Sequence, residues 1–160
     1  MMALPAAEVV AACINSGLTL ATAESLTGGL VAARIVEVPG CSAMFRGGVI
    51  AYASEVKEQV LGLDPGLLAH LVSEPVAAEL ARAATRVLGS DIGVGTTGVG
   101  GPDWLGGEPP GTVWIAVFDA RSDRLLTGRL ELSGDREMIR VGAVHAVFPL
   151  VLRLLTQAGE

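Results

Sequence analysis

The chain has 160 residues, of which 51% are hydrophobic and 18% are charged, a balance that excludes an intrinsically disordered protein. Its formal net charge of −6 and its lack of a basic run speak against binding to nucleic acid or to anionic membrane surfaces. No apolar run reaches the ~18 residues that a membrane span needs, and the N-terminus lacks the basic start of a signal peptide. We therefore expect a cytoplasmic protein whose 160 residues form one domain, with free thiols at Cys13 and Cys41.

Apolar segments alternate with polar turns along the whole chain. Gly17 ends a first helical pattern, Ser73 before Glu-Pro-Val is a typical helix start, and two apolar runs around the polar turn 120–123 suggest a hairpin. In chain order we predict a helix over 5–16, a strand over 18–22, a helix over 27–38, a strand over 47–53, helices over 54–61 and 73–88, strands over 92–97, 112–119 and 125–132, and a helix over 135–157.

This alternation predicts an α/β fold, a three-layer α/β/α sandwich on a mixed, roughly five-stranded sheet. The final helix is apolar around much of its circumference, at Val141, Val144, Val147, Phe148, Val151 and Leu155. Such a helix is either covered on both sides within its own chain or packed against a second subunit. On this ground we expect a homodimer.

The segment TAESLTGG, residues 22–29, interrupts two apolar runs with small polar residues. If the strand ends near Thr22, Ser25 lies at the strand-to-helix crossing, and the amides of residues 26–29 are free to bind an anion or a developing oxyanion. Gly28 and Gly29 then let a ligand approach the backbone closely. An ordinary capped helix start explains the same residues without any chemistry.

A count of the basic residues favours chemistry. Ten of the 11 are arginine, Lys57 is the only lysine, and Tyr52, the only tyrosine, precedes it by five residues. Lysine differs from arginine in that its ammonium can lose its proton when desolvated, as a catalytic base must. Serine, lysine and tyrosine are a known kind of nucleophile-activating set. The alternative is a surface lysine on a helix.

Two further segments are candidates for binding an anion. The glycine-rich stretch 96–102, which includes Thr97 and Gly98, follows a predicted strand and can present backbone amides to a phosphate, although a structural turn is an equal alternative. Arg136 and Arg140 lie one helical turn apart and can grip a phosphate, or can simply be solvated. No metal-ligand spacing is present, so we expect no metal.

The segments TAESLTGG, FRGGVIAYASEVK, VSEPVA, TTGVGGP, GTVWIAV and SGDRE occur in this order, and the resemblance that they carry extends over about residues 5–155. Together they resemble the C-terminal domain of the competence/damage-inducible protein CinA, the nicotinamide-nucleotide amidase family. The resemblance implies a three-layer α/β/α fold and hydrolysis of the amide of nicotinamide mononucleotide, without a metal or organic cofactor. It implies Ser25 as the nucleophile, with Lys57 and Tyr52 in the motif that activates it.

The expected mechanism passes through an acyl-enzyme. Neutral Lys57 takes the proton of Ser25, amides at the start of the predicted 27–38 helix hold the oxyanion, and Tyr52 relays a proton or orients the lysine. The residues expected to contact the pyridine nucleotide are Thr27, Gly28, Gly29, Thr97, Gly98, Arg136 and Arg140.

The sequence departs from the family pattern at three positions near these residues. Leu26 stands where a cysteine is common, and Ala53 and Ser54 stand where the family usually has Ser-Asn. These departures motivate an alternative prediction, a nucleotide-binding module with weak or no turnover.

Overall fold

The computed structural model describes residues 5–157. Its elements are α1 (Pro5–Ser16), β1 (Leu20–Glu24), α2 (Leu30–Val36), a 3-10 helix (Cys41–Ala43), β2 (Phe45–Ile50), α3 (Ser54–Gln59), a 3-10 helix (Leu67–His70), α4 (Glu74–Leu88), β3 (Ile92–Gly98), β4 (Thr112–Asp119), β5 (Arg124–Glu131) and α5 (Arg136–Thr156).

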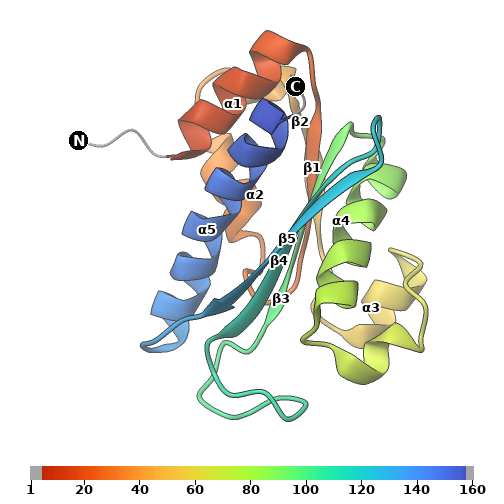
Figure 1. Cartoon of the computed structure of the whole chain (residues 1–160), viewed down its shortest axis with the longest axis vertical. Coiled ribbons are helices and arrows are strands. Elements are labelled where there is room, and N and C mark those ends of the chain that lie inside the picture. Colours follow the sequence, from red (N-terminus) through yellow and green to blue (C-terminus); the bar gives the residue numbers. More distant parts are fainter. Residues whose placement is uncertain (1–4, 158–160) are drawn as a thin grey trace.

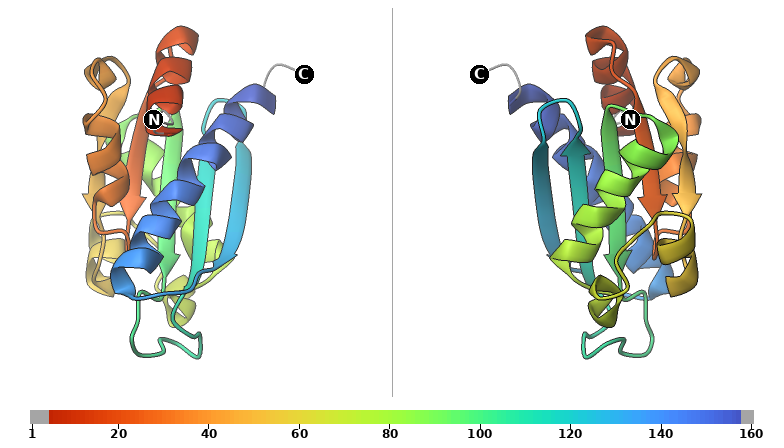
Figure 2. Two further views of the ribbon diagram at one scale, coloured as in Figure 1. Left: turned by 90° about the vertical axis from the view of Figure 1, so that its left-hand side faces the viewer. Right: turned by 90° about the vertical axis from the view of Figure 1, so that its right-hand side faces the viewer.

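The five strands form one open, mixed sheet in the order β2-β1-β3-β4-β5. β1 runs parallel to both β2 and β3, whereas β4 is antiparallel to β3 and to β5. Helices α1, α2 and α5 cover one face of the sheet, and α3 and α4 cover the other, as the two side views show (Figures 1 and 2). The predicted α/β fold with a mixed five-stranded sheet is confirmed, and so is the hairpin of its last two strands.

The core is aliphatic on both faces of the sheet. One cluster joins α1, α2 and α5 to the sheet, and smaller clusters lie beneath α4 and the segment that follows α3. Gly93 and Gly95 let α4 approach β3, since a Cβ on them would lie 2.0 Å from the carbonyl oxygen of Ala81 and 2.3 Å from that of Ala77. Close approach of α4 therefore depends on small residues in both elements.

Two predicted boundaries were wrong around the segment TAESLTGG. β1 ends at Glu24 instead of Thr22, because Thr22 and Glu24 are buried in it with their polar atoms hydrogen-bonded. α2 begins at Leu30 instead of residue 27 and ends at Val36. Gly28 and Gly29 have φ angles of +59° and +96°, which are incompatible with the first turn of a right-handed helix.

One face of α5 is buried within the chain. Its side chains pack on β4 and β5 and against α1 and α2. By length and composition alone α5 is apolar enough to cross a membrane, contrary to the expectation from the sequence, but it serves as a core helix of this domain. The inner face of the helix is thus covered by its own chain, whereas Val141 and Leu155 are only partly buried and Met138 is 60% exposed, and the homodimer stays a prediction.

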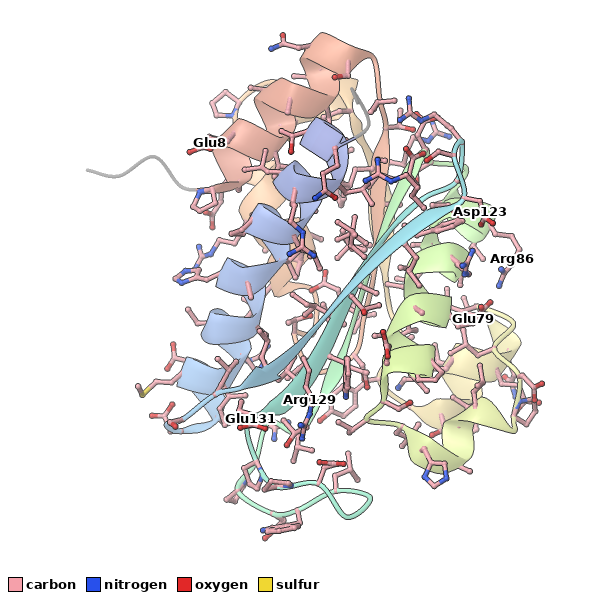
Figure 3. All side chains as sticks on the ribbon, in the orientation of Figure 1. Glu8, Glu79, Arg86, Asp123, Arg129 and Glu131 are labelled. Atoms are coloured by element: carbon pink, nitrogen blue, oxygen red, sulfur yellow. The ribbon has the colours of Figure 1, made fainter. Side chains whose placement is uncertain are left out.

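Charged side chains pair on the outer surface. On α4, Nη1 of Arg86 lies 3.4 Å from Oε1 of Glu79, and on β5, Nη1 of Arg129 lies 3.2 Å from Oε1 of Glu131. Both pairs project toward solvent (Figure 3). Exposed pairs of this kind contribute about 0–1 kcal/mol each, so the fold depends mainly on the aliphatic core.

Candidate active site

The candidate residues converge where β1, β2 and β3 end. The chain leaves β1 through α2 to reach β2 on one side, then crosses by α3 and α4 to β3 on the other side. A crevice forms outside the carboxyl ends of parallel strands at such a change of direction. Ser25 directly follows β1, Tyr52 lies two residues after β2, and Gly98 is the last residue of β3.

A cavity of about 520 Å³ opens at this edge of the sheet, a size in the range of small-molecule sites. Six of the ten predicted site residues line it: Ser25, Tyr52, Lys57, Thr97, Gly98 and Arg136. The other lining residues are Leu26, Ala53, Ser54, Leu71, Val72, Val99, Gly100, Gly101, Asp103, Trp104 and Leu105.

Lys57 is a buried cation without an ion pair among the described residues. Its side chain is 2% exposed, and its Nζ donates a hydrogen bond to the backbone carbonyl of Tyr52 at 2.9 Å. Burial lowers the pKa of the Lys57 ammonium below its ordinary value. A lysine in this environment loses its proton more readily than one in water. This is the property that the sequence analysis expected of the single lysine.

The side chain of Tyr52 lies differently from our expectation. It is 61% exposed, and its hydroxyl accepts a hydrogen bond from Nη2 of Arg136 at 2.9 Å. Arg136 also donates to the carbonyl of Gly101, so it joins the β2–α3 connection to the glycine-rich loop. Tyr52 thus contacts Lys57 through its backbone carbonyl and Arg136 through its hydroxyl.

Ser25 lies in a tight turn whose shape depends on Glu24. The Ser25 amide donates to the carbonyl of Thr96 at 3.0 Å, and the Ser25 carbonyl accepts from the amide of Gly28 at 3.1 Å. The carboxylate of Glu24, 1% exposed, accepts from Thr22 Oγ1, Thr27 Oγ1 and the amides of Val31 and Ala32. Glu24 is thus a buried cap that joins the turn to α2.

This cap changes the expected oxyanion site. The Glu24 carboxylate binds the amides of Val31 and Ala32, which lie beyond the predicted residues 26–29. Of the four predicted amides, that of Gly28 donates to the Ser25 carbonyl and is no longer free. Among the described residues, the Leu26 amide makes no backbone hydrogen bond, and Leu26 lines the cavity directly after Ser25. It is the amide next in sequence after that of Ser25, which donates to Thr96.

Thr27, Gly28 and Gly29 do not line the cavity. Thr27 is fully buried, with its hydroxyl 2.6 Å from Glu24 Oε1 and 2.8 Å from Thr96 Oγ1. The two glycines provide the left-handed backbone of the turn, and a Cβ on Gly29 would lie 3.0 Å from Cδ1 of Ile50. These three residues shape the turn instead of contacting a ligand in the cavity.

Arg136 and Arg140 have separate positions, although they lie on one face of α5. Arg136 lines the cavity, whereas Arg140 donates to the carbonyls of Leu26 and Thr27 at 3.0 and 3.1 Å and holds the turn that carries Ser25. The pair therefore does not face one phosphate in the cavity.

The sequence interpretation did not assign several residues of the cavity wall to the site, among them Asp103, Leu71 and Val72. Leu71 and Val72 precede α4, and the Thr97 hydroxyl donates a hydrogen bond to the Leu71 carbonyl at 2.7 Å. This contact joins segments that are distant in the sequence, so no local sequence pattern predicts it. Within residues 5–157, no group of three or more His, Cys, Asp or Glu side chains is arranged to hold a metal ion. The cavity wall includes a serine, a buried lysine, an arginine and an aspartate.

Known proteins resemble the chain over nearly its whole length. A model of the CinA C-terminal domain matches residues 3–155. The CinA-like protein of Geobacter sulfurreducens is 47% identical over 148 residues, and that of Frankia casuarinae is 45% identical over 149 residues. A crystal structure of a competence-damaged protein (CinA) superfamily protein from Klebsiella pneumoniae is 31% identical, has a TM-score of 0.90, and covers 96% of either chain.

A second crystal structure, of a CinA superfamily protein from Escherichia coli, is 29% identical, with a TM-score of 0.89, and is matched over 94% of this chain and 88% of its own. The match covers 89% of this chain and 35% of the Geobacter protein, and 92% of this chain and 34% of the Frankia protein. The chain thus spans about a third of the length of these curated relatives.

Proposed function

The chain belongs to the CinA C-terminal domain family, and from this premise we propose that it hydrolyses the carboxamide of nicotinamide mononucleotide to nicotinic acid mononucleotide and ammonia. The reaction would belong to pyridine-nucleotide recycling in the cytoplasm. The observation that carries the proposal is the placement of Ser25 and the buried, unpaired Lys57 in one cavity at the carboxyl ends of the strands.

The first half of the reaction is acylation. The Oγ of Ser25 attacks the carboxamide carbon while its proton passes to the neutral Nζ of Lys57. The negative charge on the tetrahedral oxygen is met by a backbone donor, a role proposed for the Leu26 amide because it directly follows Ser25 and makes no backbone hydrogen bond among the described residues. The carbon–nitrogen bond breaks, the proton on Lys57 passes to the leaving nitrogen, and ammonia departs from a nicotinoyl ester of Ser25.

The second half is hydrolysis of that ester. Lys57 takes a proton from water, the resulting hydroxide attacks the ester carbon, and the Ser25 oxygen leaves with the proton held by Lys57. The carbonyl of Tyr52 orients Nζ throughout, since it accepts the hydrogen bond that Lys57 donates. Arg136 is the only arginine that lines the cavity, so it is the group proposed to meet the 5′-phosphate.

The lysine step is tested by Lys57→Arg. Arginine keeps the positive charge but cannot lose its proton at neutral pH, so ammonia release from nicotinamide mononucleotide should fall by at least ~100-fold. Arg46→Lys, an exchange of the same two residue types at an exposed site, should retain the wild-type rate. A Lys57→Arg enzyme with wild-type turnover would remove Lys57 from the role of base.

A second candidate function is a nucleotide-binding module without turnover. One observation favours it: among the described residues, Lys57 donates to the Tyr52 carbonyl and makes no hydrogen bond to Ser25. Calorimetry with nicotinamide mononucleotide separates the two candidates. Binding without ammonia release supports the module, and ammonia release rejects it.

A further inference from the structure

The two most exposed aromatic side chains of the described residues lie in the same cavity. Trp104 is 68% exposed and Tyr52 is 61% exposed, and both line the cavity that contains Ser25. Only 4% of the chain is aromatic, so two exposed rings at one place are not a by-product of composition. Exposed aromatic side chains that line a cavity offer flat faces for a planar ligand.

Trp104 is not what holds its loop in place. Leu105 and Glu108 exchange two backbone hydrogen bonds of 3.1 and 3.0 Å around Gly106 and Gly107, whose positive φ angles of 58° and 82° form a tight hairpin turn. Arg136 binds the Gly101 carbonyl at the start of the loop. The indole of Trp104 makes no hydrogen bond within residues 5–157, so its ring is free to contact a ligand.

The charged side chains that line the cavity indicate which charges a ligand should carry. Three ionisable side chains of Asp, Lys and Arg line it: Lys57, Arg136, and Asp103, which precedes Trp104 in the sequence. A carboxylate in a cavity that also has aromatic faces favours a cation, whereas Arg136 favours an anion. The cavity therefore has complementary places for a molecule that carries both charges. A cationic ring near Lys57 also favours the neutral amine that a base requires.

We propose that Trp104, with Tyr52 and the carboxylate of Asp103, binds the positively charged pyridinium ring of the substrate and selects ring-quaternised pyridine carboxamides over neutral ones. This specificity rests on the proposed function for the identity of the ring. The positive charge is held against the indole face, where a cation–π contact contributes about 2- to 30-fold in affinity, depending on how far the ring is desolvated.

The test compares two ligands that share every group except the ring, which is a cationic pyridinium in one and a neutral dihydropyridine in the other. Nicotinamide mononucleotide has a pyridinium ring, and its 1,4-dihydro form has the same carboxamide, ribose and phosphate on a neutral ring. Calorimetry with the Ser25→Ala variant, which blocks turnover, should show tighter binding of the pyridinium form by about 2- to 30-fold. Adding Trp104→Leu should bring this ratio close to one, and adding Asp103→Asn should reduce it.

Two matched controls lie outside the cavity. Trp114→Leu replaces the other tryptophan, which packs beneath α4, and Glu108→Gln neutralises an acid of the same loop that pairs with Arg129. Both should keep the ratio of the Ser25→Ala parent, and thermal melting should show that every variant is folded.

A ratio of one in the parent, or an unchanged ratio after Trp104→Leu, would overturn the proposal, as would failure of both ligands to bind. A pyridinium preference that depends on Trp104, in a chain whose wild type releases no ammonia, would uphold this inference and reject the proposed function. Equal turnover of both ligands by the wild type would uphold the proposed function and reject this inference.

Discussion

The buried carboxylate of Glu24 provides a quantitative test of how the turn that contains Ser25 is held. Glu24→Gln keeps the size of the side chain but replaces one carboxylate oxygen by an amide nitrogen, which cannot accept a hydrogen bond. The carboxylate now serves four donors, including the amides of Val31 at 2.9 Å and Ala32 at 3.1 Å. In glutamine, at least one backbone amide loses its acceptor in a site that is 1% exposed.

The expected cost follows from these contacts. One unsatisfied buried amide costs about 1–3 kcal/mol, and the loss of charge weakens the hydrogen bonds that remain, so the free energy of unfolding should fall by about 2–4 kcal/mol. For a domain of this size, the melting temperature should fall by about 4–16 °C. Ammonia release should fall as well, because Ser25 directly follows Glu24 in the turn.

The assay is equilibrium denaturation in urea together with thermal melting followed by circular dichroism. Glu8→Gln is the matched control, since Glu8 lies in the first turn of α1 and projects into solvent (Figure 3); it should change stability by no more than about 0.5 kcal/mol. If Glu24→Gln melts within 1–2 °C of the control, on the order of 0.5 kcal/mol, the cap does not hold the turn as described.

Two further predictions concern buried titratable groups. Lys57→Met should abolish ammonia release yet leave the free energy of unfolding at pH 7 unchanged or raised by about 1–2 kcal/mol. Burial lowers the pKa of Lys57, so the free-energy cost of burying its charge is full below that pKa and disappears as the pH rises toward the ordinary pKa of lysine. The melting temperature of the wild type should therefore approach that of the variant at alkaline pH. A loss of several kcal/mol at pH 7 would contradict this account. Burial, and secondarily the charge of Asp91, raises the pKa of the Cys13 thiol to about 11. A thiol reagent at pH 8 should therefore label the half-buried Cys41 and leave Cys13 unlabelled until the chain unfolds. Rapid labelling of both thiols in the folded protein would contradict this and show that the core around α1 opens.

Sequence patterns predicted the parts of the fold that local signals specify. The start of α5 at Arg136 follows from Asp135, whose side chain accepts from the amide of Met138 at 2.9 Å three residues on. The uninterrupted apolar run of β4 identified a strand, Thr112–Asp119, with the bounds that we predicted. Both signals lie within a few residues of the structure they determine.

The predictions were wrong where contacts between residues distant in the sequence determine the structure. Glu24 caps α2 from seven and eight residues away, at the end of the preceding strand, so neither the end of β1 nor the start of α2 follows from a capping pattern in the sequence. The interaction of Arg136 with the Tyr52 hydroxyl joins residues 84 positions apart. Counting residue types identified Lys57 and Tyr52 as unusual, but only the fold shows which atom of Tyr52 meets the lysine.

The central claim is that Ser25 forms a covalent bond with the substrate carbonyl, and Ser25→Ala tests it most directly. The wild type, mixed with nicotinamide mononucleotide and quenched in acid during turnover, should release ammonia and give a nicotinoyl-nucleotide adduct on the peptide that contains Ser25 by mass spectrometry. Ser25→Ala should bind the same ligand, form no adduct and release no ammonia above the uncatalysed rate. Ammonia release by Ser25→Ala at the wild-type rate would contradict the account.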